Sequence, residues 1–292
     1  MYPLTKIGEK ITSLTGVRAI MKDIKNTLQS RKDSIINLSP GNPVIIPEMQ
    51  QLWESCLETV KQERMLEPVL GRYGDSQGYY PFIESVVSSF NKTLGWNISP
   101  KNVLVTPGTQ ESYFLATNLF ADEHRRLFLP MNPDYTGYKS SCLAPVPPLT
   151  LEPSIHKTDR HRFKYMIDSD ALSTIQDKLG LMIFSRPTNP TGNVMDDASF
   201  HKLIQFGKER KIPVFVDSAY SEPFPDIKQA PVAMPQEDHV VYCFSFSKCG
   251  LPGERVGITI GHEWIIEQME AFESNVNIHS SRLGQAIAKV AL

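Results

Sequence analysis

The sequence predicts an α/β fold: a three-layer αβα sandwich built around a seven-stranded, mainly parallel sheet. After Gly95, short apolar runs rich in β-branched and aromatic residues alternate with helical patterns. The runs are almost continuously apolar, which is typical of strands covered by helices on both faces. The predicted strands are 102–106, 126–130, 147–151, 181–185, 213–217, 240–245 and 257–261. The predicted helices among them are 110–121, 134–143, 168–178, 197–210 and 263–272.

The first third of the chain has a different pattern. An amphipathic patch at 17–28 precedes a turn-forming cluster at 37–43. Apolar residues then recur at helical spacing from Pro47 to Val60, and again from Tyr80 to Leu94. The last segment, 282–292, is helical in pattern and stops without a capping signal, so we expect the natural chain to continue beyond it.

Composition excludes several classes of function. The formal net charge of −2 provides no field for nucleic acid or an anionic membrane, so we expect neither as a partner. No run is long enough to span a bilayer, and the polar start lacks a signal-peptide core. The four cysteines have no metal-ligand spacing, which favours reduced thiols in a cytoplasmic protein without a metal site. No glycine-rich nucleotide motif is present.

The stretch after the predicted strand 240–245 carries the strongest chemical signal. Ser245, Ser247, Lys248 and Arg255 follow one another within a dozen residues. Desolvation at the end of an apolar strand favours the neutral amine of a lysine, which Schiff-base chemistry requires. Arg255 with Ser245 would hold a phosphate by charge-assisted hydrogen bonds. The alternative is a surface lysine in a Gly/Pro turn.

Three other strand ends carry candidate ligand contacts, because ligands of such sheets bind at the carboxyl ends of the strands. Gly108 opens a helix whose free N–H groups would attract phosphate, unless this is an ordinary capped junction. Tyr135 would stack on a planar ligand or simply pack at the loop. The loop 185–193 is constrained by two prolines, includes a candidate cis Asn189–Pro190 bond, and would aim the Asn189 amide into the site.

A carboxylate, Asp217, ends the apolar strand 213–217. A buried carboxylate is costly unless a cation pairs with it. A protonated pyridine nitrogen would serve, and the alternative partner is an arginine in the core. Tyr220, three residues further on, would donate to a phenolate oxygen on the same ring.

Three motifs occur in order: Asn-Pro-Thr-Gly at 189–192, Asp-x-x-Tyr at 217–220, and Ser-x-Ser-Lys-x-x-Leu-Pro-Gly-x-Arg at 245–255. This set resembles the fold-type I pyridoxal-phosphate aminotransferases of class I and II. Within them the chain looks most similar to valine–pyruvate aminotransferases, through 40–43 with 46–49, 185–194 and 248–253. The resemblance runs over the whole chain, which corresponds to about the first two-thirds of such an enzyme.

The resemblance implies a pyridoxal 5'-phosphate site. Lys248 would form the Schiff base and then shuttle the proton, Asp217 would hold the pyridine nitrogen protonated, and Asn189 with Tyr220 would bind the ring oxygen. Tyr135 would stack on the ring. The phosphate would be bound by Gly108, Thr109, Gln110, Ser245 and Arg255, and by Tyr73 of a neighbouring subunit in a homodimer with shared sites. Ser247 would also belong to the cofactor-binding residues. Gly41 and Asn189 would help hold the substrate carboxylate.

The resemblance also implies a division of the chain. Residues 1–46 would form an N-terminal arm and part of a small domain, 47–280 the large cofactor-binding domain, and 281–292 the start of a helix leading to a C-terminal small domain. In the family that last part carries the arginine that grips the substrate α-carboxylate, and no residue here matches its context.

The expected reaction is transamination between a small neutral amino acid, valine or alanine, and a 2-oxo acid such as pyruvate. Three alternatives remain open at this point. One is another pyridoxal-phosphate reaction on the same fold, such as β-elimination by a C–S lyase. The second is a shortened, cofactor-binding protein with little catalysis. The third is an α/β domain that binds no cofactor.

Overall fold

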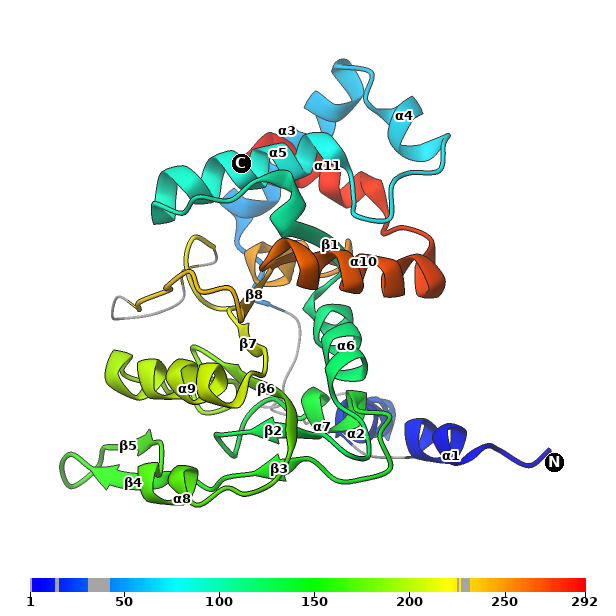
Figure 1. The fold of residues 1–292 in the computed structure, drawn as a ribbon. Helices are drawn as coiled ribbons and strands as arrows, with labels where there is room; N and C mark the ends of the chain where they lie inside the picture. The colour runs from blue at the N-terminus through cyan, green and yellow to red at the C-terminus, as the bar shows by residue number, and fades with distance from the viewer. Residues whose placement is uncertain (1, 14–15, 31–42, 225, 227–231) are drawn as a thin grey trace.

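Seven strands form one sheet in the computed structural model, which describes residues 2–13, 16–30, 43–224, 226 and 232–292 (Figure 1). From one edge to the other they are β1 (Val103–Pro107), β9 (Val256–Ile260), β8 (Val240–Ser245), β7 (Val214–Asp217), β6 (Leu179–Ser185), β2 (Arg126–Leu129) and β3 (Leu149–Thr150). Strands β8, β7, β6, β2 and β3 run parallel, while β9 is antiparallel to both of its neighbours. The predicted seven-stranded, mainly parallel sheet is confirmed.

Helices cover both faces of this sheet, which confirms the three layers. Successive residues of β6 show the division: Met182 and Phe184 belong to one core cluster, while Leu181 and Ile183 belong to another. The first cluster packs against α3 (Pro47–Gln62), α5 (Tyr80–Leu94), α9 (Asp197–Arg210) and α11 (Arg282–Ala291). The second packs against α6 (Thr109–Phe120), α7 (Gly137–Ser141) and α10 (Glu263–Asn277). Helices α3, α5 and α11 lie side by side at the top of Figure 1.

The remaining elements are short or peripheral. They are α1 (Lys6–Thr12), α2 (Gly16–Ser30), α4 (Leu66–Leu70), α8 (Ser169–Ser173), the hairpin strands β4 (Ser154–Lys157) and β5 (Phe163–Met166), and 3-10 turns at Pro100–Asn102 and Phe246–Cys249. Within the described ranges, no helix is both long and apolar enough to cross a bilayer. The four cysteines form no disulfide. The proposed boundaries of the domains remain predictions.

The structure differs from the sequence-based element assignment in several places, among them the expected strand 147–151, which shrinks to β3, and the helices α1 and α4, which were not predicted. The hairpin β4–β5 was missed because every residue of β4 is exposed, which leaves no alternation of apolar and polar residues. The helices expected at 134–143 and 168–178 shrink to α7 and α8. Helix α7 starts late because Asp134 bonds to the Tyr135 backbone and to β6 instead of entering the helix.

Helices α6 and α10 bring together two carboxyl groups, Glu111 and Glu273. Glu273 is fully buried and Glu111 is half-buried. Burial, together with the neighbouring charge of Glu111, raises the pKa of Glu273 to about 8. In the folded protein Glu273 therefore keeps a proton at neutral pH that the unfolded chain has released.

Replacing Glu273 with glutamine should stabilise the protein in alkaline but not in acidic solution. Between the ordinary glutamate pKa of 4.5 and the raised value of about 8 the native state holds the extra proton, so stability falls as pH rises through that window. Glu273→Gln removes the ionisation, and we expect the free energy of unfolding near pH 9 to rise by about 1–3 kcal/mol. Urea unfolding at about pH 4 and about pH 9 measures the effect. The exposed Glu267 of the same helix provides the control, Glu267→Gln, and an equal gain at both pH values would contradict the expectation.

Candidate active site

The predicted site residues converge on one polar pocket of ≈ 210 Å³ at the carboxyl edge of the parallel strands. Strand register explains the convergence, because Ser185 pairs with Asp217 and Asp217 pairs with Cys243, so neighbouring strands end at one level. The predicted residues that line the pocket are Thr109, Gln110, Tyr135, Asn189, Asp217, Tyr220, Ser245, Ser247, Lys248 and Arg255.

One corner of this pocket lies where β1 meets α6. Gly108 has a φ of 83°, and α6 begins beyond it without a side-chain cap on its N–H groups. A Cβ on Gly108 would lie 2.2 Å from Arg255 Nη2, and a Cβ on Gly257 would lie 2.5 Å from the Gly108 carbonyl carbon. Arg255 Nη1 donates to Ser247 Oγ at 3.1 Å. Two glycines therefore let backbone N–H groups and a guanidinium approach one point closely, which suits an anion.

Asp217 lies at the floor of the pocket with 7% of its surface exposed. It accepts hydrogen bonds from Tyr138 Oη at 2.9 Å and from the Ala219 N–H at 3.1 Å. Both donors are neutral, and burial raises the pKa of Asp217 despite them. Among the described residues Asp217 forms no ion pair. A cation at this carboxylate would supply the missing charge.

The buried arginine nearest in sequence to the site has another partner. Arg186, only 3% exposed, directly follows β6 and forms an ion pair with Asp197. It also donates to the Met195 carbonyl at 3.0 Å and lies 4.2 Å above the Phe200 ring. Arg186 therefore anchors the loop that follows β6 and does not neutralise Asp217.

Asn189 projects from that loop toward Tyr220. Its Nδ2 lies 3.5 Å from Tyr220 Oη, and the Asn189–Pro190 bond is cis, as predicted. Tyr135 lies on another wall of the pocket, with its hydroxyl 3.4 Å from Gln110 Oε1. The pocket therefore has amide and phenol groups on one wall and an aromatic ring on another.

Lys248 occupies a tight turn directly after β8. Ser245 caps the turn by accepting from the Ser247 N–H at 3.1 Å, and Gly250 ends it with a φ of 95°. Trp53 of α3 donates to the Cys249 carbonyl at 2.8 Å and so fixes the turn from the other side. The Lys248 amine lies 5.5 Å from the centre of the Tyr220 ring. The half-buried amine thus points into the pocket rather than into solvent.

One predicted residue lies away from this cluster. Tyr73 is 84% exposed and packs edge-on against His279, and it does not line the pocket of its own chain. Gly41 lies outside the described residues. Sequence reasoning in turn missed Tyr138, Asp134 and Ser185. Tyr138 follows Tyr135 at helical spacing, which was the one available signal.

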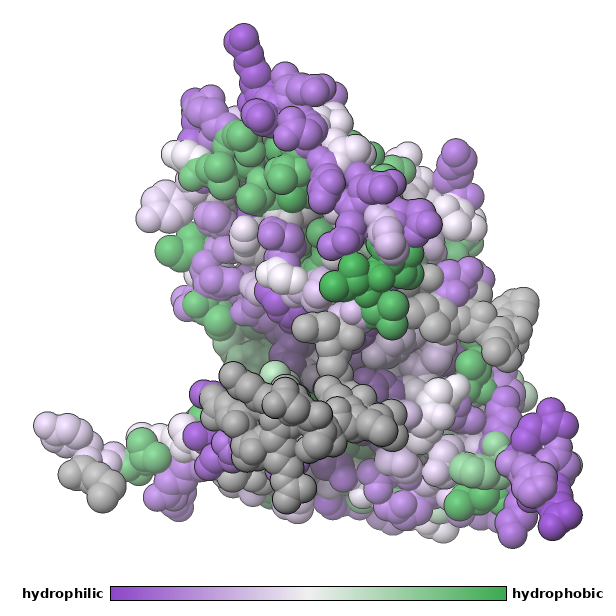
Figure 2. Space-filling view, turned by 180° about the vertical axis from the view of Figure 1, so that it is seen from behind, coloured by the Kyte–Doolittle hydropathy of each residue, from purple (hydrophilic) through white to green (hydrophobic). Residues whose placement is uncertain are grey.

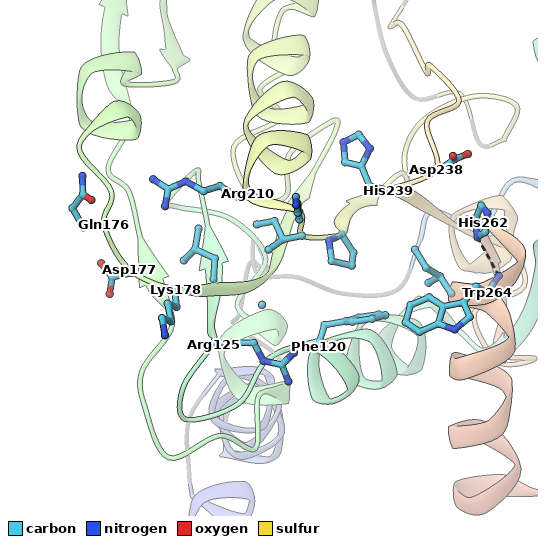
Figure 3. Close-up of a pocket in the computed structure, with 16 residues that line it drawn as sticks. Phe120, Arg125, Gln176, Asp177, Lys178, Arg210, Asp238, His239, His262 and Trp264 are labelled. Carbon is cyan, nitrogen blue, oxygen red and sulfur yellow. Dashed lines mark hydrogen bonds between the residues drawn. The ribbon is translucent and has the colours of Figure 1, made fainter.

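A different pocket, of ≈ 840 Å³, opens at the amino ends of β6 and β7 (Figure 3). Trp264 and Phe120 lie on one side of it, while Asp177 and Lys178 lie on the other. A hydrogen bond of 3.2 Å joins the backbone N–H of Trp264 to His262 Nδ1. None of the predicted site residues lines this pocket, and it lies at the edge where sheets of this kind do not bind ligands. The polar pocket is therefore the candidate active site.

Comparison with known proteins agrees with this geometry. The profile of the family "Aminotransferase class I and II" matches residues 33–292. The valine–pyruvate aminotransferase of Escherichia coli K12 is 32% identical over 285 residues, which are 96% of this chain and 68% of that protein. This chain belongs to the class I and II aminotransferases. They are pyridoxal-phosphate-dependent transferases.

Solved aminotransferases share the fold. A putative amino-acid aminotransferase from Psychrobacter arcticum superposes with a TM-score of 0.92 at 30% identity, covering 99% of this chain and 71% of that one. Valine–pyruvate aminotransferase AvtA from Salmonella typhimurium superposes with a TM-score of 0.83 at 30% identity, covering 94% and 68%. This aminotransferase chain therefore spans roughly 70% of the length of both structures.

The residues of this aminotransferase fit the family's cofactor. The corner at Gly108 and Arg255 has backbone N–H groups and a cation where the phosphate needs donors. Asp217 is a buried carboxylate with only neutral donors, which suits a protonated ring nitrogen. The half-buried Lys248 amine faces the same pocket. Phosphate, ring nitrogen and aldehyde would each meet a chemically matched group.

Proposed function

We propose that this chain binds pyridoxal phosphate and transfers an amino group between a small neutral amino acid, such as valine or alanine, and a 2-oxo acid such as pyruvate. The convergence of Lys248, Asp217 and Arg255 on one pocket carries the proposal. The substrate pair is supported by the name of the relative from Escherichia coli.

Each wall of the pocket would hold one part of the cofactor. Gly108, Thr109, Gln110, Ser245, Ser247 and Arg255 would bind the phosphate. Asp217 would keep the pyridine nitrogen protonated, with Tyr138 fixing its carboxylate. Asn189 and Tyr220 would donate to the ring oxygen, and Tyr135 would cover one face of the ring. When bound, the cofactor supplies an aldehyde that captures amino groups and a ring that takes up electrons from the substrate α-carbon.

Lys248 would carry the proton transfer. Its amine would accept the proton from the substrate α-carbon and return it on the other side of the transferred nitrogen, which requires a neutral amine at that moment. Trp53 and Ser245 hold the turn that aims this amine, so the base would need little reorganisation. These residues act as general base and as positioning groups in the proposed reaction.

An apolar groove beside Lys248 supports a neutral substrate. This groove, of ≈ 940 Å³, is lined by Val44, Ile45, Ile46, Met49, Trp53 and Phe246, among others. Apolar patches separated by hydrophilic surface are also visible on the face in Figure 2. Lys248 is the only charged side chain among the described residues that line the groove, so a second carboxylate on the substrate would find no cation there besides the proposed Schiff-base lysine. Gly41 stays a predicted contact for the substrate carboxylate, with Asn189.

We also propose a homodimer with shared sites. The exposed ring of Tyr73 would reach the phosphate bound by the neighbouring subunit, which would account for an 84% exposed tyrosine on a glycine-bounded loop.

Borohydride reduction in the presence of pyridoxal phosphate tests the proposal. We expect a stable pyridoxyl adduct on the peptide that contains Lys248, detected by mass spectrometry. In separate samples that are not reduced, valine and alanine should shift the cofactor's visible absorbance in single-turnover mixing, and aspartate should not. An adduct on another lysine, or none, would reject the assignment.

The samples that are not reduced also separate the alternatives. Pyruvate and ammonia released from a sulfur amino acid would indicate β-elimination instead of amino-group exchange. An adduct on Lys248 without any response to amino acids would indicate cofactor binding with little catalysis. Lys202→Ala serves as the control, because Lys202 lies exposed on α9 and its amine donates to Ser169 Oγ at 3.1 Å, away from the candidate active site.

A further inference from the structure

A second carboxylate, Asp134, lies behind the wall of the candidate active site. It follows β2 and precedes α7, and its Oδ2 accepts the Ser185 N–H at 2.9 Å. Its Oδ1 accepts the Ser185 hydroxyl and also the Tyr135 N–H, the latter at 2.6 Å. Asp134 does not line the pocket, so none of the roles proposed above includes it.

Through Ser185 this carboxylate reaches Asn189. Because the Ser185 hydroxyl donates its proton to Asp134, its lone pairs remain free to accept the Asn189 N–H at 3.2 Å. The Ser185 carbonyl also accepts the Thr188 hydroxyl at 3.1 Å, which closes the loop on the same serine. Asn189 then meets Tyr220 at 3.5 Å on the pocket side. Hydrogen bonds therefore connect Asp134 to the backbone of Asn189, and the side-chain amide of the same residue is the group proposed to bind the ring oxygen with Tyr220.

The same carboxylate also fixes Tyr135. The N–H bond from Tyr135 to Asp134 orients the residue proposed to cover the ring face. Burial raises the pKa of Asp134 to about 7, with the nearby Asp217 adding to the rise, while the Ser185 and Tyr135 donors lower it. Because Asp134 is buried, its carboxylate depends on three protein donors, which are the Ser185 N–H, the Ser185 hydroxyl and the Tyr135 N–H. Hydrogen bonds to a buried carboxylate are strong and directional.

We propose that Asp134 is a positioning residue that sets the geometry of two groups around the cofactor ring, Asn189 through Ser185 and Tyr135 directly. This inference rests on the proposed function and extends it to a residue without direct contact with cofactor or substrate. Asp134 connects the loop that follows β2 with the loop that follows β6. One carboxylate thereby aligns the Tyr135 ring with the Asn189 amide.

The chain offers a matched control for this inference. Asp196 accepts the Ser199 N–H at 2.9 Å and the Ser199 hydroxyl at 2.8 Å, the same pair of hydrogen bonds that Asp134 makes with Ser185. Asp196 caps α9 and does not line the candidate active site. Asp196→Asn thus removes a carboxylate with an equivalent pair of hydrogen bonds to a serine, whose role is to cap a helix.

The test compares Asp134→Asn, Ser185→Ala and their double variant with Asp196→Asn. For Asp134→Asn and Ser185→Ala we expect about tenfold weaker binding of pyridoxal phosphate, a difference of about 1.4 kcal/mol. We also expect the pH midpoint of the bound cofactor's visible absorbance to shift, because that band reports the surroundings of the ring oxygen. The double variant should bind pyridoxal phosphate no more weakly than the single variants, because the two substitutions interrupt the same hydrogen-bond path from Asp134 through Ser185 to Asn189. The affinity for inorganic phosphate, which probes the Gly108 corner alone, should stay unchanged.

Asp196→Asn should lower the thermal midpoint without moving the absorbance band. The inference is overturned if Asp134→Asn likewise changes only thermal stability, or if the effects of Asp134→Asn and Ser185→Ala multiply in the double variant. Should Asp134→Asn fail to fold, Ser185→Ala decides alone, and a wild-type band and affinity for it would reject the role of this hydrogen-bond path. A wild-type protein that binds no pyridoxal phosphate would overturn the proposed function together with this inference.

Discussion

Replacing Lys248 with alanine should lower the rate of amino-group transfer by about 10²–10⁴-fold, the range in which a positioned general acid–base group contributes. The variant loses the amine that would move the proton, while the Gly108 corner and the Asp217 carboxylate stay intact. The turn itself should persist, because Ser245 and Trp53 hold it through contacts to backbone atoms. Single-turnover mixing with valine, followed by visible absorbance, measures the rate.

Two comparisons make this result specific. Lys202→Ala should transfer amino groups at the wild-type rate. Lys248→Arg retains a positive charge but not a titratable amine, so it should be as slow as the alanine variant. If Lys248→Ala transferred amino groups within tenfold of the wild type, Lys248 would not be the general base.

Replacing Asp217 with asparagine should affect catalysis and stability in opposite directions. Without a cofactor, the folded protein carries a buried carboxylate whose two hydrogen-bond donors are both neutral. Burial raises its pKa above the ordinary aspartate value of 3.8, so the native state is penalised once pH rises past that value. Asparagine has nearly the same shape and removes the charge. Its single carbonyl oxygen can accept the Ala219 N–H while its NH₂ donates to the Tyr138 oxygen. We therefore expect the cofactor-free variant to gain about 1 kcal/mol of unfolding free energy near neutral pH and none near pH 3.

Catalysis should suffer from the same change. A neutral amide cannot hold the ring nitrogen protonated, so transfer should slow by about 10²–10³-fold, as when one preorganised electrostatic partner is removed. Urea unfolding of the cofactor-free protein and single-turnover rates of the loaded protein give the two readouts. A variant that loses stability as well as rate would show that Asp217 is chiefly a structural residue, and the assignment of its partner would fall.

The sheet could be predicted because its signal is local. Strands β6, β7 and β8 are buried along their whole length, so their residues are almost all apolar and the runs stand out from the helices around them. The candidate site was accessible for a related reason. Lys248, Asp217 and Asn189 each follow a strand within a few residues, and parallel strands place those ends at one edge.

What could not be predicted depends on contacts between distant segments. The alternative partners of Asp217 illustrate this. Arg186, the buried arginine that follows the neighbouring strand β6, pairs with Asp197. The hydroxyl that donates to Asp217 comes from Tyr138, which is 79 residues away in the sequence. The hydrogen bonds between Asp134 and Ser185 join residues 51 positions apart. Such partners share no local pattern, because they are set by strand order and by the register between strands.

The amino-acid sequence thus contained the layers, the strands and the residue types at each strand end, since burial imposes a local pattern on each of them. The hairpin β4–β5 left no such pattern, because β4 is exposed along its whole length and β5 is only partly buried. Folding also selected the hydrogen-bond partners of each polar side chain, because a buried carboxylate takes whichever donors three-dimensional packing brings within reach. Lys248 and Asp217 were therefore visible in the sequence, whereas the network of Tyr138, Asp134 and Ser185 around the site emerged with the folded sheet.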